Sequence, residues 1–249
     1  MNKKNKKQEK DQQNLNQIIR KDAKSCFVES LNDCFRIGKA HLRFVKYDVT
    51  KPAKSRQTDM VDIFVDISEV LELQRQFIGG EMRCRVDARK DKKDVSTPLF
   101  ECMGGVSDTK LKLQDRRRKD KKSLSRVARL VIGAKKDFMF IAQSGPGEES
   151  EKGLIVPRFG DNPENNVAIG LTFADLSELI LMTVAHYNAW LTGWYLHMSG
   201  QSANINKQSN ESEEDDEDAD SDYEDADVEE DEEDYGDGEL GDYPDDDDE

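Results

Sequence analysis

Basic and aromatic residues alternate along several short stretches of the chain. If 41–47 is a strand, His41, Arg43 and Tyr47 share one face, because successive side chains of a strand point to opposite sides. Binding of single-stranded nucleic acid without base preference needs cations for the backbone and aromatic faces on which bases stack. The pattern therefore predicts a surface for unpaired nucleic acid. The residues that we expect to contact its backbone or bases are Lys39, Arg43, Lys46, Tyr47, Arg83, Arg85, Lys135, Lys136 and Arg158.

Each basic residue of this set also has a plainer interpretation, as part of an ordinary solvated face. The set argues more strongly than any one member. Phe138 and Phe140 are expected in the core rather than under a base. The connection 110–126 is very basic, and it is predicted to be either a helix or a mobile loop. Its segment 116–122 (RRRKDKK) is either a phosphate clamp or a loop that adds affinity without fixed geometry.

Histidine and cysteine provide no evident metal site. His186 and His197 are eleven residues apart on a predicted helix, so they lie about 16 Å apart by helix rise, too far for one metal ion. His41 is isolated in the sequence. The four cysteines form no CxxC pair and have no histidine at a zinc-ligand spacing, and they are expected to be reduced: Cys26, Cys34, Cys84 and Cys102. We predict neither a metal nor a cofactor.

Catalytic motifs are also lacking. Asp59, Asp62 and Asp66 have the composition of a nuclease cluster, but alternation along the edge of a strand explains them better. Gly145-Pro-Gly147 is predicted to be a turn, because no strand, GxxxxGK[ST] and helix surround it. We therefore expect a protein that is not an enzyme.

Opposite charges are sorted along the chain. The segment 211–249 has 26 acidic residues and no Lys or Arg, so all 37 basic residues and the other 27 acidic ones lie in 1–210. The body has a net charge of +10 and the tail of −26. A cationic body suggests a polyanionic partner. The tail is a tethered competitor for the same surface, and it is too acidic to fold alone.

The pattern divides the chain into four parts. We expect a disordered basic arm over 1–20, a nucleic-acid-binding domain over 21–198, a linker over 199–210 and a disordered acidic tail over 211–249. The start of the chain lacks the apolar stretch of a secretory signal, and no run of about 18 apolar residues could span a membrane. Together with the reduced cysteines, this predicts a cytoplasmic protein of a bacterial or phage-infected cell.

Strand signals dominate the body, and two helices frame it. A short amphipathic helix is predicted over 21–33. The long helix from Phe173 to about Met198 has apolar residues at intervals of three and four, so one face must be buried. That face is predicted to contact the core first and a dimer partner second. Strands are predicted over 35–49, 59–67, 81–88, 98–103, 126–133, 137–143, 153–159 and 166–172.

Two parts of the body resemble each other. The segment that begins at Asp66 (DISEVLEL) aligns without gaps with the segment that begins at Thr172 (TFADLSEL). In both, a strand leads into a helix, and an acid three residues after the capping residue forms a near capping box. FRIG at 35–38 is also similar to LVIG at 130–133. These matches predict two repeated units, at about 34–80 and 126–198.

Several strands leading into one helix, repeated twice, resemble the Whirly and transcriptional-coactivator-like group of single-stranded DNA-binding proteins. FRIGK at 35–39 is similar to the segment that opens the first strand of the coactivator family, and 167–179 is similar to its strand-to-helix junction. The likeness covers about 35–80 and 130–198. It implies an α+β fold, with mainly antiparallel sheets in two strand-rich units that each end in a helix.

The chain departs from the coactivator pattern by carrying two non-identical units and an acidic extension. Acidic C-termini are common in bacterial and phage single-stranded DNA-binding proteins, where they recruit replication partners and weaken non-cognate binding. This tail lacks the terminal Pro-Phe of the bacterial type, so the resemblance does not identify its partner.

These observations predict a non-catalytic, homo-oligomeric single-stranded DNA-binding protein of DNA replication, repair or plasmid and phage DNA processing. Its tail would inhibit binding or recruit replication or repair proteins. Two alternatives stay open. The chain could be an acidic-tailed chaperone or adaptor that binds basic proteins, with its body as a dimerising platform. It could also bind RNA, which the sequence does not distinguish from DNA.

Overall fold

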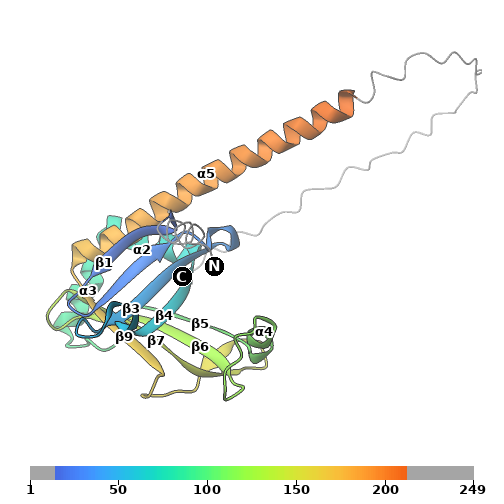
Figure 1. The fold of residues 1–249 in the computed structure, drawn as a ribbon. Coiled ribbons are helices and arrows are strands. Elements are labelled where there is room, and N and C mark those ends of the chain that lie inside the picture. Colours follow the sequence, from blue (N-terminus) through green and yellow to red (C-terminus); the bar gives the residue numbers. More distant parts are fainter. Residues whose placement is uncertain (1–14, 212–249) are drawn as a thin grey trace, which may run out of the picture. The chain divides into compact units, whose positions relative to one another are not determined.

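The computed structural model describes residues 15–211, and the side chains of these except 53 and 200–211. Most of the predicted basic arm and the predicted acidic tail beyond Glu211 lie outside the described residues. The chain divides after Ser199, and the described residues before that point belong to one compact unit (Figure 1). Within the described part, no helix combines the length and the apolar character needed to span a lipid bilayer.

The N-terminal sheet is a meander of four antiparallel strands that neighbour one another in chain order. Its strands are β1 (Gln17–Asp22), β2 (Cys26–Leu31), β3 (Lys39–Tyr47) and β4 (Gln57–Asp66). Short 3₁₀ turns, η1 (Phe35–Ile37) and η2 (Ala53–Ser55), lie in the second and third connections. Gly38 adopts the left-handed backbone conformation (φ 70°) that leads the chain from η1 into β3.

The helix expected over 21–33 is wrong, because 17–31 form the hairpin of β1 and β2. For the same reason, the disorder expected over 1–20 is wrong for residues 17–20. Val28 and Ser30 are fully buried and Phe27 is only half-buried, which is the alternation of a strand. The apolar spacing of four residues that suggested a helix fits a strand equally well, because four is a multiple of two. Pairing of all of β2 with β3 decides between them.

Two helices follow the first sheet, α2 (Ile67–Ile78) and α3 (Glu81–Asp91). The strand expected over 81–88 is therefore wrong. Met82 and Val86 are buried and Cys84 between them is exposed, which is the spacing of a helix. Gly80 takes a left-handed conformation (φ 75°) and so separates α2 from α3 sharply.

The C-terminal sheet is also antiparallel, and its strands lie near the predicted ranges with one exception. They are β5 (Phe100–Val106), β6 (Ser123–Ile132), β7 (Phe138–Glu149), β8 (Ile155–Pro157) and β9 (Asn165–Leu171). The exception is β7, which continues to Glu149. The turn predicted at Gly145–Gly147 is therefore wrong, because these residues pair with β6. The main strands follow the order β5, β6, β7, β9, while β8 pairs with the far end of β7. Both sheets therefore use the same up-and-down arrangement.

The basic connection contains both a helix and a loop. Helix α4 (Asp108–Leu113) comes first, and the segment 116–122, here called the basic loop, leads into β6. Arg117 pairs with Asp108 at 2.7 Å. Arg118 pairs with Glu164 at 2.5 Å and with Asp120 at 2.9 Å. These ion pairs fix two of the three arginines of the loop to the fold.

Helix α5 (Phe173–Glu211) begins where the sequence predicts and continues through the expected linker. The predicted capping box is formed. The Asp175 amide donates to Thr172 Oγ1 at 3.1 Å, and the Thr172 amide donates to Asp175 Oδ2 at 3.0 Å. At the equivalent start of α2, Asp66 makes no side-chain capping bond, so only the second of the two boxes exists.

The two sheets share one core with α2 and α5. Phe44 of β3 meets Phe140 of β7 edge to face, with ring centroids 4.9 Å apart. One face of each sheet and one face of each helix are buried in this cluster. The buried face of α5 includes Leu176, Leu179, Ile180 and Val184. The long helix is thus a core element, as predicted.

An α+β fold with two antiparallel sheets is confirmed. The last strand of each sheet runs directly into a helix, β4 into α2 and β9 into α5. The segments aligned at Asp66 and Thr172 hold these two junctions. Both sheets begin before the predicted boundaries of the two units, at 34 and 126, because the first sheet starts at Gln17 and the second at Phe100.

Candidate functional site

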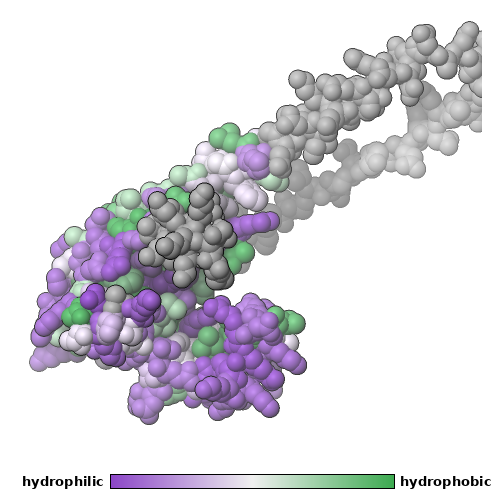
Figure 2. Space-filling view, viewed as in Figure 1, coloured by the Kyte–Doolittle hydropathy of each residue, from purple (hydrophilic) through white to green (hydrophobic). Residues whose placement is uncertain are grey.

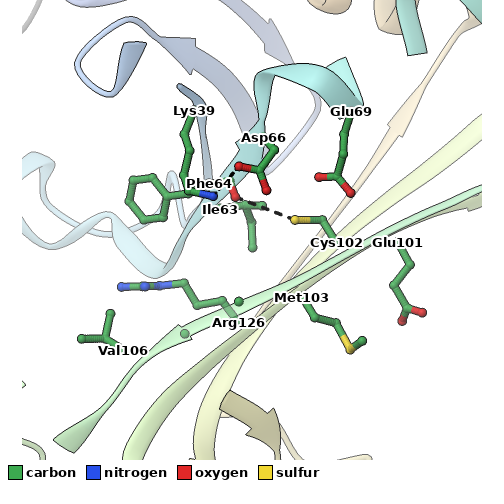
Figure 3. Close-up of a pocket in the computed structure, with 12 residues that line it drawn as sticks. Lys39, Ile63, Phe64, Asp66, Glu69, Glu101, Cys102, Met103, Val106 and Arg126 are labelled. Carbon is green, nitrogen blue, oxygen red and sulfur yellow. Dashed lines mark hydrogen bonds and ion pairs between the residues drawn. The ribbon is translucent and has the colours of Figure 1, made fainter. Parts of the chain in front are cut away.

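The two sheets leave a cleft between strand edges that do not pair. β4 is the last strand of the N-terminal sheet, and β5 is the first of the C-terminal sheet. The cavity between them has a volume of about 350 Å³ (Figure 3). The Sγ atom of Cys102 lies 3.8 Å from the carbonyl oxygen of Phe64, so the two edges meet there. The cleft is lined by Lys39, Ile63, Phe64, Asp66, Glu69, Glu101, Cys102, Met103, Gly104, Gly105, Val106 and Arg126.

Arg126 is the unusual side chain of this cleft. It lies on β6 in the same register as Ala128 and Leu130, which are buried in the core, so its side chain enters the space between the sheets. Burial lowers the pKa of Arg126, and the charge of Asp62 opposes this effect. No carboxylate of the described residues lies within ion-pair distance of its guanidinium group. A desolvated, unpaired guanidinium group is costly and is suited to an anionic ligand.

Phe64 stands beside Arg126. Its ring is half-buried, and the guanidinium group of Arg126 lies 5.5 Å from the ring centroid. In Figure 3 both side chains extend to the same side of the cleft. On its other side Phe64 stacks with His41, with centroids 4.6 Å apart. The Phe64 ring therefore lies between the imidazole ring of His41 and the guanidinium group of Arg126.

A charged network supports this stack from the outer face of the N-terminal sheet. His41 is 3% exposed, and its two ring nitrogens face Asp33 and Asp62 at 2.9 and 3.0 Å. Arg43 Nε donates to the same Asp62 oxygen at 2.8 Å. Burial raises the pKa of Asp62, but the hydrogen bonds from His41 and Arg43 outweigh it and lower that pKa to about 2.

The lowered pKa of Asp62 predicts a contribution to stability that acid removes. The fall from 3.8 to about 2 corresponds to about 2 kcal/mol, since one pKa unit is about 1.4 kcal/mol. The folded state keeps Asp62 ionised at a pH where the unfolded chain protonates it. The contribution is therefore complete above about pH 4 and is lost as the pH falls toward 2.

Urea unfolding of the wild type and of Asp62→Asn between pH 7 and pH 2 measures this contribution. We expect the variant to be less stable by about 2 kcal/mol at neutral pH, with the two curves converging near pH 2. Asp59→Asn is the control, because it removes a carboxylate of the same strand whose ion pair, to Lys46, is longer at 3.8 Å. A constant gap between wild type and Asp62→Asn at every pH would contradict the prediction.

Three of the predicted contact residues on β3 are paired with acids of β4. Lys39 meets Asp66 at 2.6 Å, Arg43 meets Asp62 at 2.8 Å and Lys46 meets Asp59 at 3.8 Å. Each pair is also a register pair of the two antiparallel strands. Opposite charges across a sheet stabilise strand pairing. The carboxylates considered as a nuclease cluster are thus the partners of the cations considered as a binding surface.

The other predicted residues are spread over distant elements. Tyr47 donates to the Ala23 carbonyl oxygen at 3.0 Å. Arg85 donates to the Leu99 carbonyl oxygen at 2.8 Å from α3, and Arg158 pairs with Glu148 at 2.6 Å. Arg83 lies over the ring of Phe173 at 4.5 Å. Lys135 and Lys136 are exposed in the turn between β6 and β7.

Of the nine predicted contacts, only Lys39 lines the cleft. The set therefore does not form one surface. Phe138 and Phe140, predicted as core residues, are 0% and 3% exposed, which confirms that prediction.

Sequence reasoning missed both Phe64 and Arg126. The segment that contains Arg126, RVARLVI, alternates in strand fashion, and Arg126 falls in the register of its apolar face. A single cation among the core-facing residues of a predicted strand was the sequence signal that could have identified Arg126. Reasoning from the sequence also took His41 as isolated, whereas the fold brings it to Asp33 and Asp62.

The surroundings of the cleft are polar and partly cationic. Arg116, in the basic loop, lies close enough for its charge to lower the pKa of Arg126 further. Figure 2 shows hydrophilic residues over the surface around α4. Lys119, Lys121 and Lys122 of the loop are exposed. Comparison with known proteins assigns no family, because no family model, no curated protein and no solved structure matches the chain.

Proposed function

We propose that the chain binds single-stranded DNA without catalysis and that the cleft between β4 and β5 is its contact site. Arg126 is the observation that carries the proposal, because it is a desolvated guanidinium group with no carboxylate partner among the described residues. An arginine in that state gains most from an anion that enters the cleft, and phosphate is the anion that its planar donors match.

Phe64 supports the choice of an unpaired strand over a duplex. A base can stack on a half-buried aromatic ring only if it is free of its partner base, and such stacking contributes about 1–3 kcal/mol per base. The ring stands 5.5 Å from the guanidinium group of Arg126. His41 covers the other face of this ring, so a base would stack on Phe64 in the place of the guanidinium group, as Arg126 turns to the phosphate of the same nucleotide.

The charge of the chain supports the same partner. Residues 1–210 have a net charge of +10. Arg116 of the basic loop lies close enough to Arg126 for its charge to lower the pKa of that residue, and the lysines of the same loop are exposed. The cations of β3 contribute less than the sequence suggests, since acids of β4 neutralise them. We infer that the basic loop attracts single-stranded DNA toward the cleft and that Arg126 and Phe64 form the fixed contacts with it.

The likeness to Whirly and transcriptional-coactivator-like proteins stays part of this proposal. Two antiparallel meanders, each followed by a helix, have the arrangement that the resemblance implies. Replication, repair and plasmid or phage DNA processing remain the proposed setting. Homo-oligomerisation and recruitment of replication or repair proteins by the tail belong to the same proposal.

Binding of the full chain to labelled oligonucleotides tests the function. Single-stranded DNA, the duplex of the same sequence and the matching RNA are compared by fluorescence anisotropy at several salt concentrations. We expect single-stranded DNA to bind about tenfold more tightly than duplex, with affinity falling as salt rises. Equal affinity for RNA would make the chain an RNA-binding protein. Absence of binding to all three would favour the adaptor that recognises basic proteins.

Deleting 211–249 is expected to raise the affinity for single-stranded DNA and to make release less sensitive to salt. The segment carries 26 acidic residues on the same chain as the cationic body and so competes with phosphates at high effective concentration. The same anisotropy titration measures the change. A tail of equal length with Asn and Gln in place of its acids is the control, and it should behave like the deletion. Unchanged affinity in both variants would remove autoinhibition from the proposal.

A further inference from the structure

We propose that Asp33, Cys34 and His41 form a zinc-binding site. The site is separate from the cleft, and the proposal does not depend on binding of nucleic acid.

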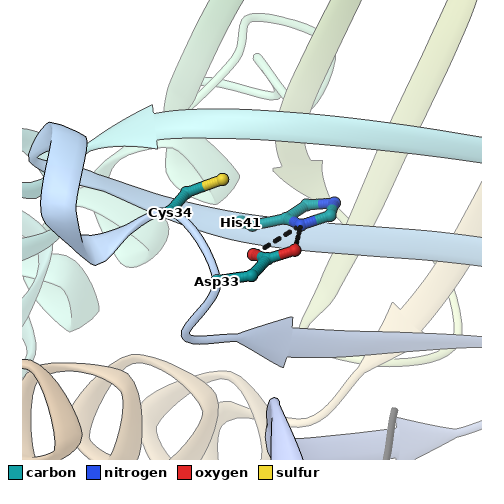
Figure 4. Close-up of side chains that lie close together, drawn as sticks. All are labelled: Asp33, Cys34 and His41. Atoms are coloured by element: carbon teal, nitrogen blue, oxygen red, sulfur yellow. Dashed lines mark hydrogen bonds and ion pairs between the residues drawn. The ribbon is translucent and has the colours of Figure 1, made fainter. Parts of the chain in front are cut away.

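The three side chains converge from two elements. Asp33 and Cys34 lie between β2 and η1, and His41 is the third residue of β3. Gly38, with φ 70°, turns the chain back after η1, and the Lys39 amide donates to the Cys34 carbonyl oxygen at 3.2 Å. This short reversal holds Asp33 and Cys34 against His41, as Figure 4 shows.

The potential ligand atoms are already close together. One carboxylate oxygen of Asp33, the Sγ atom of Cys34 and a ring nitrogen of His41 all lie within 4.8 Å of one another. His41 Nδ1 is 2.9 and 3.1 Å from the two Asp33 oxygens. Tetrahedral zinc places such donors about 3.3–3.6 Å apart, given metal–ligand distances of about 2.0–2.3 Å. A separation of 4.8 Å would have to shorten by about 1.2 Å, and the distance of 2.9 Å between His41 Nδ1 and Asp33 Oδ1 would have to widen by about 0.4 Å, to reach this geometry.

The second nitrogen of the ring is held as a metal-binding histidine requires. His41 Nε2 lies 3.0 Å from Asp62 Oδ1, and Arg43 fixes the same oxygen at 2.8 Å. A carboxylate on the far nitrogen orients the ring, sets its tautomer and makes the near nitrogen a better ligand. Asp62 is therefore a positioning residue, and Nδ1 is the atom that would bind the metal.

The donor set selects zinc. One thiolate, one imidazole and one carboxylate are the ligands that Zn²⁺ uses most, whereas Mg²⁺ and Ca²⁺ require oxygen donors. On binding, the ion replaces the thiol proton of Cys34 and any proton on Nδ1, which pass to solvent. The thiolate and the carboxylate then balance the two charges of the ion. The Asp33 side chain is 36% exposed, so water can complete the fourth position.

Cobalt titration of the full chain tests the site. Co²⁺ takes the place of Zn²⁺, and a thiolate ligand gives a sulfur-to-cobalt charge-transfer band that oxygen ligands do not give. The acidic segment 211–249 attracts divalent cations, but it contains neither Cys nor His, so this band does not report on it. Excess Mg²⁺ in the buffer occupies those carboxylates. We expect one Co²⁺ per chain with the band, and its loss when Zn²⁺ is added.

Three variants assign the ligands. Cys34→Ser should lose the charge-transfer band, while Cys84→Ser, which alters an exposed cysteine on α3, should keep it. Asp62→Asn should keep the band but weaken Co²⁺ binding about 10–100-fold, the usual effect of removing a partner of a ligating histidine. Absence of the band in the wild type, or its persistence in Cys34→Ser, would overturn the proposal.

Discussion

Replacing Arg126 by methionine is expected to weaken binding of single-stranded DNA about 10–100-fold without lowering the stability of the fold. Hydrogen bonds to a charged group contribute about 1.5–3 kcal/mol, and 1.4 kcal/mol corresponds to a factor of ten. Arg126 has no carboxylate within ion-pair distance among the described residues, so no described carboxylate takes the place of a phosphate as its partner. Anisotropy titration of the full chain measures the loss.

The expected effect of Arg126→Met on the stability of the fold follows from the burial of the same side chain. Desolvation disfavours the charged form of Arg126, and the charge of Asp62 offsets this effect only in part; a partly buried charge without an ion-pair partner costs free energy that an apolar side chain of similar length does not. Arg126→Met should therefore unfold at the same urea concentration as the wild type or at a higher one. Loss of binding together with unchanged or raised stability is typical of a residue kept for a ligand.

Arg129→Met is the matched control. Arg129 lies three residues further along β6, and its Nε atom pairs with Glu101 at 2.6 Å on the surface. The variant removes the same charge from the same strand, so a purely electrostatic effect would be equal in both. Glu101 also lines the cleft and loses its partner in this variant, so we expect Arg129→Met to lower affinity, but clearly less than Arg126→Met. Equal losses in the two variants would show that the cleft is not the contact site.

Strong periodicity explains which elements the sequence predicted. The alternating segments that became β4, β6, β7 and β9 are each compatible with one period only, and the capping box of Thr172 and Asp175 marks the start of α5. The failures over 21–33 and 81–88 both involve apolar residues four apart, a spacing that strands and helices share. Partners elsewhere in the chain resolve them: β2 pairs with β3, and Gly80 starts α3.

The site was less predictable than the fold. Cations of β3 were correctly placed on a strand, but their role depends on what stands opposite. Lys39, Arg43 and Lys46 face three aspartates of β4 at one common register. The three aspartates were also correctly placed along a strand, but the sequence did not show that they stand opposite these cations. Register was the missing information, and it turns a predicted binding surface into a ladder of structural ion pairs.

The cleft itself depends on contacts that no local pattern contains. It forms because β4 and β5, from different sheets, come together at Cys102 and Phe64 without pairing. Which strand edges meet is a property of how the two sheets pack. The sequence shows that Arg126 lies in the core-facing register of β6, but it does not show which residues surround this side chain.

Phe44→Ala is expected to destabilise the fold by about 3–5 kcal/mol, the range for truncating a buried phenylalanine. Phe44 is 0% exposed and contacts Phe140 across the two sheets at 4.9 Å, so its removal leaves a cavity where the sheets meet. This is a large part of the 5–15 kcal/mol that holds an ordinary domain together. Urea or thermal unfolding measures the change.

Phe64→Ala is the counterpart on the neighbouring strand. Phe64 points to the opposite face of the N-terminal sheet, toward Arg126 and His41, and it is only half-buried. We expect a smaller loss of stability than in Phe44→Ala and a fall in single-strand affinity of about 1–3 kcal/mol, the value of one stacked base. Phe44→Ala, assayed under conditions where it stays folded, should bind almost normally. If Phe44→Ala lost affinity as strongly as Phe64→Ala, the outer face and the core would not be separate in function, because damage to packing alone would account for both results.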